Sequence, residues 1–172
     1  MVTKRKIKKS NNKTKKNKYK SCVALITPDK SNVNGIVYFI QKRDKLQIIY
    51  NINKLSNGNH GFHIHRCGDL SKGCSSACEH FNPDNRDHGG LADINSHAGD
   101  LGNIFSENGF CKGVIETNKI SINPKKNNCI VGRMIVVHKG ADDLGKGKNK
   151  ESKKTGNSGA RVGCGVIGIK EE

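Results

Sequence analysis

The chain has 172 residues, of which only 33% are hydrophobic and 5% aromatic, and it contains 20 Gly and no Trp. This length fits one ordinary domain, and the composition favours short strands joined by glycine turns over a helical bundle. No apolar run approaches the roughly 20 residues of a membrane-spanning helix, which excludes a transmembrane helical protein.

Much of the net charge of +16 lies in the first 20 residues, which hold ten Lys or Arg and no Asp or Glu. We expect residues 1–20 to be a disordered basic extension and residues 21–172 to be the folded domain. The extension could bind nucleic acid, an anionic membrane or an acidic partner, or it could be solvated without a dedicated partner.

The basic extension lacks the hydrophobic segment of a signal peptide, so secretion is not expected. The expected location is the cytoplasm, or the cytoplasm of the host cell if the gene is viral. Nuclear or virion association through the extension stays open.

Nine segments have strand character, and the alternation of Ile48, Tyr50 and Ile52 is the clearest half-buried pattern. The predicted strands are 21–27, 33–41, 47–53, 60–66, 101–106, 110–116, 119–122, 129–138 and 161–169. Two polar, glycine-rich stretches separate them, at 68–99 and at 140–158, and the second has a helical turn at 149–153. Loops this long are usually functional. The pattern predicts an antiparallel sandwich or barrel.

Six of the seven histidines fall where they can bind a pair of metal ions. His63 and His65 point to the same face of their strand, because alternate residues of a strand share a face. The other candidates follow in the chain as His80, His88, His97, Asp100 and His138. A histidine-rich set with one carboxylate suits copper and zinc better than calcium or magnesium.

The residues around these histidines resemble the motifs of copper/zinc superoxide dismutases. The resemblance runs in order over residues 21–170. It rests on segments 60–69, 73–77, 80–83, 88–90, 97–103, 136–138, 141–147 and 160–168. It implies an all-β fold, an eight-stranded antiparallel Greek-key barrel or sandwich of immunoglobulin-like form with two long functional loops.

The resemblance also implies one copper ion and one zinc ion per subunit. The implied copper ligands are His63, His65, His80 and His138, and the implied zinc ligands are His80, His88, His97 and Asp100. His80 would bind both ions as an imidazolate, since loss of both ring protons needs two nearby cations. We interpret His60 as a hydrogen-bonding residue, because the ligand count is complete without it.

Asp142 has an implied role behind the metal ligands. It would accept hydrogen bonds from His63 and His88, and so fix their tautomers and connect the two ions. The alternative interpretation is a capping residue within its loop.

Three side chains are implied to act on a small anion. Arg161 would lie over the open copper position and orient the anion by hydrogen bonding. Lys154 and Thr155 would attract the anion and narrow the channel. Lys150 departs from the family pattern, in which an acidic residue is usual at that position.

Seven cysteines in a chain without a signal peptide ordinarily suggest reduced thiols. The resemblance nevertheless pairs Cys74 with Cys164, in a disulfide that closes a loop of about 90 residues. The remaining five are expected to be free: Cys22, Cys67, Cys78, Cys111 and Cys129. A bulky residue is usual at position 67, at the dimer contact. A homodimer remains the expectation, given Gly68, Val131, Val166 and Ile169.

The activity implied by the resemblance is conversion of superoxide to oxygen and hydrogen peroxide, which protects against oxidative stress. Copper would cycle between Cu(II) and Cu(I), and His80 would carry a proton. The alternative is a non-catalytic copper-delivery or metal-storage protein of the same fold. Related copper chaperones carry an added Met-x-Cys-x-x-Cys domain and a Cys-x-Cys tail, and this chain has neither. A nucleic-acid binder acting through the basic extension is a third interpretation.

Overall fold

The structure is a computed structural model that describes residues 20–171. The predicted basic extension therefore lies outside the described residues, except for Lys20. The strands are β1 Ser21–Pro28, β2 Asn34–Lys42, β3 Lys45–Asn53, β4 Gly58–His65, β5 Ser71–Cys74, β6 Asp100–Ser106, β7 Phe110–Thr117, β8 Met134–His138, β9 Arg161–Val166 and β10 Gly168–Ile169. The helices are the 3₁₀ turn η1 Ser75–Ala77 and the short α1 Ser152–Thr155.

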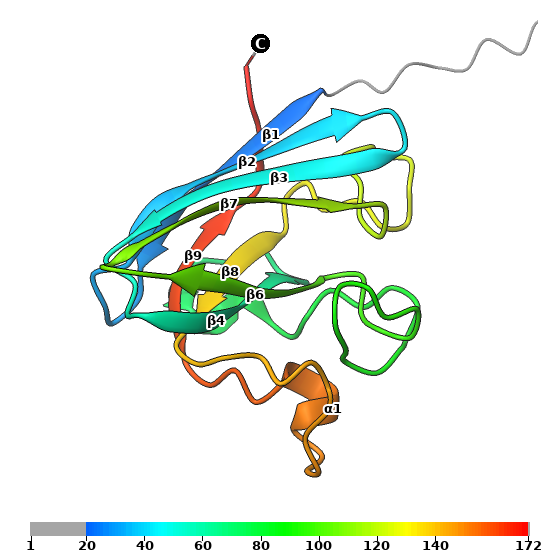
Figure 1. Ribbon diagram of the computed structural model, residues 1–172. Coiled ribbons are helices and arrows are strands. Elements are labelled where there is room, and N and C mark those ends of the chain that lie inside the picture. The colour runs from blue at the N-terminus through cyan, green and yellow to red at the C-terminus, as the bar shows by residue number, and fades with distance from the viewer. Residues whose placement is uncertain (1–19, 172) are drawn as a thin grey trace, which may run out of the picture.

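Eight strands form one antiparallel path in the order β6-β4-β8-β9-β1-β2-β3-β7, and β10 pairs with β1. In Figure 1, β1, β2, β3 and β7 form one layer over β4, β6 and β8. Strands β6 and β7 lie at the two ends of the path and are close in space, so the barrel is nearly closed. The connection from β3 to β4 passes over both, which is a Greek-key crossing. The predicted fold class is confirmed.

The barrel interior is filled by alternate residues of the strands. Ile48 and Ile52 of β3 are fully buried, as their alternation predicts. Phe62 and Ile64 of β4 also point inward and are fully buried. The residues between them therefore point out of the barrel. Because they too are buried, β4 must be covered on its outer face as well.

The two long loops provide this cover. The first connects β4 to β6 and contains β5 and η1, and the second connects β8 to β9 and contains α1. The first loop lies along the outer edge of β4, where Phe81 N donates to Ile64 O at 2.8 Å and Ile64 N donates to Gly99 O at 2.9 Å. Figure 1 shows α1 at the end of the barrel where the loops gather. Within residues 20–171, no helix is long and apolar enough to span a membrane.

Three details of the predicted secondary structure are wrong. The short strand β5 lies within the stretch 68–99, for which no strand was predicted. The segment 119–122 forms no strand and makes only an isolated bridge between Ser121 and Cys129. Its alternating Ile120 and Ile122 are buried because a loop packs onto the core. The predicted strand 129–138 begins only at Met134, after a turn at Gly132, where φ is 80°.

Two disulfides hold the first loop. Cys74 is bonded to Cys164 of β9, as the resemblance implies. Cys67 is bonded to Cys78, so the expectation that these two residues are free is wrong. The free cysteines of the described chain are Cys22, Cys111 and Cys129.

Candidate metal centre

The outer face of β4 places the first two histidines. His63 and His65 alternate with the core residues of this strand and are 0% and 1% exposed. Next to β4, strand β8 ends at His138, which is also buried. The first loop brings in His80, which forms a bridge with His65. Three segments far apart in the sequence thus meet at one place.

Four ring nitrogens face one another in this cluster. Candidate ligand atoms of His63, His65, His80 and His138 all lie within 4.8 Å of one another. The second nitrogen of each ring is held elsewhere. Nδ1 of His65 lies 2.9 Å from Cys78 O, and Nδ1 of His138 lies 3.1 Å from Gly159 O. The Nε2 atoms of His65 and His138, 3.3 Å apart, are therefore left facing each other.

A second cluster surrounds the buried carboxylate of Asp100. Its Oδ1 lies 2.9 Å from Nδ1 of His80, 3.0 Å from Nδ1 of His88 and 3.2 Å from Nδ1 of His97. The edge of a tetrahedron around zinc is about 3.4 Å, for bonds of about 2.0–2.1 Å. The three distances from Oδ1 of Asp100 are each slightly shorter than this edge. Oδ2 of Asp100 accepts hydrogen bonds from the backbone of Gly89 and His97.

By proximity alone, His63 would replace His97 in the second cluster, since His63, His80, His88 and Asp100 also offer atoms within 4.8 Å. The hydrogen bonds argue against that set. Nε2 of His63 is bonded to Asp142 at 2.9 Å, and its Nδ1 belongs to the first cluster. No nitrogen of His63 remains for a second ion, whereas Nδ1 of His97 is directed at Asp100.

His80 is common to both clusters. Its Nδ1 faces Asp100, and its Nε2 is buried without a hydrogen-bond partner among residues 20–171. Nδ1 of His63 is buried in the same unpartnered state, and the two rings lie 4.0 Å apart. A buried nitrogen without a partner is costly, and a metal ion would satisfy it. The residues present therefore fit a copper ion on one side of His80 and a zinc ion on the other.

The carboxylate of Asp142 connects the two clusters. Oδ2 accepts a hydrogen bond from Nε2 of His63 at 2.9 Å, and Oδ1 accepts one from Nε2 of His88 at 2.8 Å. This is the arrangement that the sequence predicted. Gly156 makes room for it, because a Cβ atom at this position would overlap Oδ1 of Asp142.

The protonation states suit metal binding. Burial, reinforced by the nearby His80, lowers the pKa of His63 well below its usual value, and burial lowers that of His138 to about 4. Burial alone would raise the pKa of Asp142, but its hydrogen bonds with histidines hold it well below the usual range. At neutral pH the rings of His63 and His138 are neutral and the carboxylate of Asp142 is charged, which is the state that metal ligands require.

His88 differs from His63 and His138 in the direction of its pKa shift. Its burial lowers the pKa, but the adjacent carboxylates of Asp100 and Asp142 raise it to about 9. Without metal this ring is an imidazolium at neutral pH, so an ion that binds here must displace its proton.

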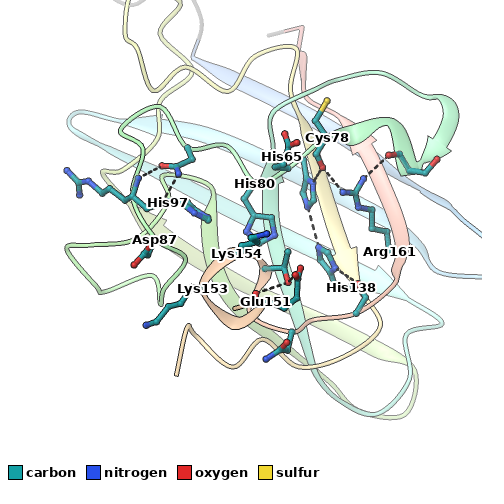
Figure 2. A pocket seen from close by; sticks show the side chains of 17 residues that line it. His65, Cys78, His80, Asp87, His97, His138, Glu151, Lys153, Lys154 and Arg161 are labelled. Atoms are coloured by element: carbon teal, nitrogen blue, oxygen red, sulfur yellow. Dashed lines mark hydrogen bonds between the residues drawn. The ribbon is translucent and has the colours of Figure 1, made fainter. Parts of the chain in front are cut away.

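An open cavity of about 990 Å³ leads to the first cluster. Figure 2 shows His65, His80 and His138 on its floor with Arg161 beside them. Lys154 and Thr155 also line the cavity. The cavity reaches both clusters, because His97 of the second cluster also lines it, whereas His63 and Asp100 are fully buried behind it.

Backbone carbonyls hold Arg161 at the cavity floor. Nη1 donates to Cys74 O at 2.6 Å and to Ser75 O at 3.1 Å, and Nη2 donates to Cys78 O at 2.5 Å. All three acceptors belong to the disulfide-held part of the first loop. The guanidinium is therefore fixed in position. The sequence predicted Arg161 as a candidate residue, but it did not predict the carbonyls that hold it.

His60 lies behind the first cluster and makes hydrogen bonds, as predicted. Its Nδ1 is 2.9 Å from His138 O and its Nε2 is 2.8 Å from Ser56 O. Sequence reasoning missed the carbonyls of Cys78 and Gly159, which orient His65 and His138. Backbone acceptors carry no residue-type signal, so nothing in the sequence pointed to these two carbonyls.

Comparisons with known proteins agree with this geometry. The family model described as copper/zinc superoxide dismutase matches residues 33–167. A superoxide dismutase [Cu-Zn] of Paramecium bursaria Chlorella virus 1 is 47% identical over 87% of this chain and 80% of its own. Superoxide dismutase [Cu-Zn] A of Xenopus laevis is 48% identical over 80% of this chain and 91% of its own. The crystal structure of the clock protein EA4 superimposes with a TM-score of 0.83 and 40% identity, over 88% of this chain and 96% of that one.

Proposed function

The chain belongs to the copper/zinc superoxide dismutase family, and we propose which of its side chains carry out that family's reaction. The protein is an oxidoreductase with one copper and one zinc ion. When bound, copper supplies the redox chemistry, cycling between Cu(II) and Cu(I) as superoxide is converted to oxygen and hydrogen peroxide. The division of work among the residues is the proposal.

We assign copper to Nδ1 of His63 and to Nε2 of His65, His80 and His138. The observation that carries this assignment is that each ring has one nitrogen facing the cluster and the other directed at a carboxylate or carbonyl oxygen. Those outer contacts fix the tautomers and orient the rings. The imidazole set suits copper, and the open cavity leaves room for a small ligand.

We assign zinc to the second cluster. Its ligands would be Nδ1 of His80, His88 and His97 and one oxygen of Asp100. Three nitrogens and one oxygen make a closed four-coordinate site, which is typical of structural zinc. Such a site fixes the orientation of the His80 ring.

His80 is also the proposed proton carrier. Its Nε2 is buried and has no hydrogen-bond partner within the described chain, so it can hold either an ion or a proton. The ring lines the cavity, and a proton at Nε2 is within reach of a product that forms there. This proton and a second one from water complete hydrogen peroxide.

Arg161 would bind and orient the superoxide anion. Its guanidinium is fixed by carbonyls, and it is always charged. Lys154 would attract the anion from solvent, and Thr155 would narrow the wall. Thr155 is itself held by Glu151, whose Oε1 accepts from its hydroxyl at 3.0 Å. Asp142 would hold the rings of His63 and His88 in a fixed orientation relative to each other.

The test is metal analysis joined to a superoxide dismutation assay, with His138→Ala as the variant. The native protein should contain one copper and one zinc ion per chain and should be active. The variant should retain zinc and lose most copper and activity, because one of four copper donors is gone. Full activity in the variant would overturn the copper assignment, and copper binding without activity in the native protein would favour a storage or delivery role.

We also propose that the protein is a homodimer. Leu25 is 64% exposed and Ile169 is 51% exposed, on the adjacent strands β1 and β10. Close by, Gly68 packs against Gly132 and against Val166. Exposed apolar side chains beside a tightly packed glycine contact are typical of a subunit interface. Light scattering of native protein and Leu25→Asp should give a dimer and a monomer, respectively.

The proposed role of residues 1–20 is to hold the enzyme on an anionic surface such as nucleic acid, within the cytoplasm or in association with a nucleus or virion. The support is the concentration of positive charge in this segment. Full-length chain should be retained on immobilised DNA to higher salt than chain lacking residues 1–20. Equal retention would dismiss the role, and fluorescent tagging of both chains would test the location.

A further inference from the structure

The Cys67–Cys78 disulfide joins two residues that lie close to histidines of the first cluster in the sequence. Cys67 follows β4 by two residues, and Cys78 precedes His80 by two. The loop that this disulfide closes contains Cys74, which is bonded to Cys164 of β9, so the two disulfides overlap in the sequence. The segment between them supplies all three carbonyls that hold Arg161.

Cys78 has a backbone conformation that is unusual for a residue with a side chain. Its φ is 65° and its ψ is −154°. This region of φ and ψ is essentially restricted to glycine, because a Cβ atom crowds the adjacent carbonyl groups. A residue other than glycine stays there only where its surroundings hold it.

The strained conformation directs one carbonyl at two functional groups. Cys78 O lies 2.9 Å from Nδ1 of His65 and accepts a hydrogen bond from Nη2 of Arg161 at 2.5 Å. Figure 2 shows both contacts, with His65 and Arg161 on either side of Cys78. A rotation of this one peptide group would remove the contact that orients His65 and, at the same time, one of the three carbonyl contacts of Arg161.

Cys67 is a firm attachment point for the disulfide. Its backbone N donates to Ala77 O at 3.0 Å, and the preceding Arg66 N donates to Glu79 O at 2.9 Å. These hydrogen bonds fasten the residues on both sides of Cys78 to the end of β4. The disulfide adds a covalent connection at the strained residue itself.

We propose that the Cys67–Cys78 disulfide is a positioning device that keeps Cys78 in its glycine-like conformation, so that one carbonyl orients both His65 and Arg161. The inference rests on the proposed roles of these two residues in binding copper and the anion. This role explains why position 78 can be a cysteine, although its backbone conformation is one that usually only glycine adopts.

The test compares two variants that both lack the disulfide and differ only at position 78. In Cys67→Ser/Cys78→Ser, a side chain remains in the glycine-only region with nothing covalent to hold it. In Cys67→Ser/Cys78→Gly, the same backbone conformation carries no strain. The readouts on copper- and zinc-loaded protein are the Cu(II) electron paramagnetic resonance spectrum and the affinity for azide, a small anion that binds Cu(II). Metal content is measured for every sample.

The serine pair should show an altered Cu(II) spectrum and azide affinity weakened about tenfold, as is usual when a contact behind a metal ligand is lost. The glycine pair should return to within about threefold of the native affinity and to the native spectrum. Equal losses in both pairs, or no loss in either, would overturn the proposal. If the serine pair fails to fold, the proposal requires that the glycine pair fold and load copper, and failure of both would overturn it.

Two controls separate this proposal from the assignments on which it rests. Cys129→Ser removes a free cysteine outside the metal centre and should leave both readouts unchanged. Arg161→Lys in the otherwise native chain should weaken azide binding while the disulfide stays intact. An unchanged affinity in Arg161→Lys would overturn the role of Arg161 itself, and the Cu(II) spectra of the serine and glycine pairs would then decide the proposal through His65 alone.

Discussion

Oδ2 of Asp142 accepts a hydrogen bond from Nε2 of His63 over 2.9 Å, and this contact joins the second long loop to β4. The other oxygen of the same carboxylate binds His88 at 2.8 Å. One side chain thus sets the tautomer of a residue in each metal cluster. The coupling of the two clusters runs through this carboxylate as well as through His80.

Replacement of Asp142 by Asn should weaken both metal sites. The amide keeps one carbonyl oxygen, so it can accept from only one of the two rings, and its NH₂ group opposes the other. Metal affinity should fall roughly 10- to 100-fold, measured by competition with a chelator. Asp143→Asn is the matched control, because it makes the same charge change one residue away, and its carboxylate binds Ser152 and Asn157 instead of a histidine. If both variants lost metal affinity to a similar extent, the loss would come from disturbance of the loop and not from the contact of the Asp142 carboxylate with the two rings.

Gly156→Ala should damage the same contact without touching a ligand. A Cβ atom at position 156 would overlap Oδ1 of Asp142 and lie 2.5 Å from Nε2 of His88. We expect zinc to be held more weakly by about tenfold or more, since Asp142 must move. Chelator competition on the zinc-loaded protein measures this.

Gly109→Ala is the control for Gly156→Ala. Gly109 also has a positive φ, 81°, but a Cβ atom there would meet nothing within 4 Å. Both variants carry the backbone strain of alanine at positive φ, roughly 1 kcal/mol in unfolding free energy. Only Gly156→Ala should also lose zinc. A zinc affinity in Gly156→Ala that matches the control would mean that Asp142 can shift freely.

The side chains of the metal centre could be predicted because the residue type determines which donor atom a side chain offers to a metal ion. His63 and His65 share a face by strand alternation, and the covering loops explain why that face is buried. The failed strand at 119–122 shows the limit of the same reasoning. Ile120 and Ile122 alternate as strand residues do, but burial against a core produces that pattern without a pairing strand.

The contacts that could not be predicted from the sequence are made by backbone carbonyl groups. Cys78 O orients His65 and Arg161, and Gly159 O orients His138. Any residue type has such a carbonyl, so its position follows only from the folded loop. The Cys67–Cys78 bond escaped for a related reason, because pairing among seven cysteines depends on which of them the loop brings together.

Charge at the cavity should govern the rate at which superoxide arrives. Four basic and three acidic side chains line the cavity, which are Arg86, Lys153, Lys154 and Arg161 and Glu79, Asp87 and Glu151. For Lys154→Glu we expect kcat/KM to fall a few-fold at low salt and to depend less on ionic strength, because exposed charges attract a small anion over about one Debye length. Pulse-radiolysis rates over a salt series measure both effects.

Lys112→Glu provides the comparison for Lys154→Glu. It makes the same change in net charge, but Lys112 is an exposed residue of β7 outside the cavity. Its rate and salt dependence should stay close to native. Equal effects of the two substitutions would assign the steering to overall net charge instead of to the cavity.

Thiol labelling should distinguish the three free cysteines from the four bonded ones. Burial raises the pKa of the Cys22 and Cys111 thiols to about 11, the Cys129 thiolate adding to the shift at Cys22, whereas Cys129 is partly exposed. The thiolate is the reactive form, so at pH 8 the two buried thiols are both shielded and protonated. Iodoacetamide should add one group per native chain, at Cys129. The rate at Cys22 and Cys111 should rise only as the pH approaches 11 or the chain unfolds.

Labelling of the unfolded chain, followed by mass spectrometry, counts the free thiols and the bonded cysteines. Without reductant, the unfolded chain should carry three groups, and with reductant it should carry seven, one for each cysteine. Five groups on the unfolded, unreduced chain would mean that the Cys67–Cys78 bond is absent and that Cys78 keeps its conformation by hydrogen bonds alone. Because the two disulfides close loops of 11 and 90 residues, their separate loss should lower the unfolding free energy by about 3 and about 4–5 kcal/mol. Denaturant unfolding of Cys67→Ser/Cys78→Ser, which keeps a side chain at position 78, and of Cys74→Ser/Cys164→Ser would measure these two losses.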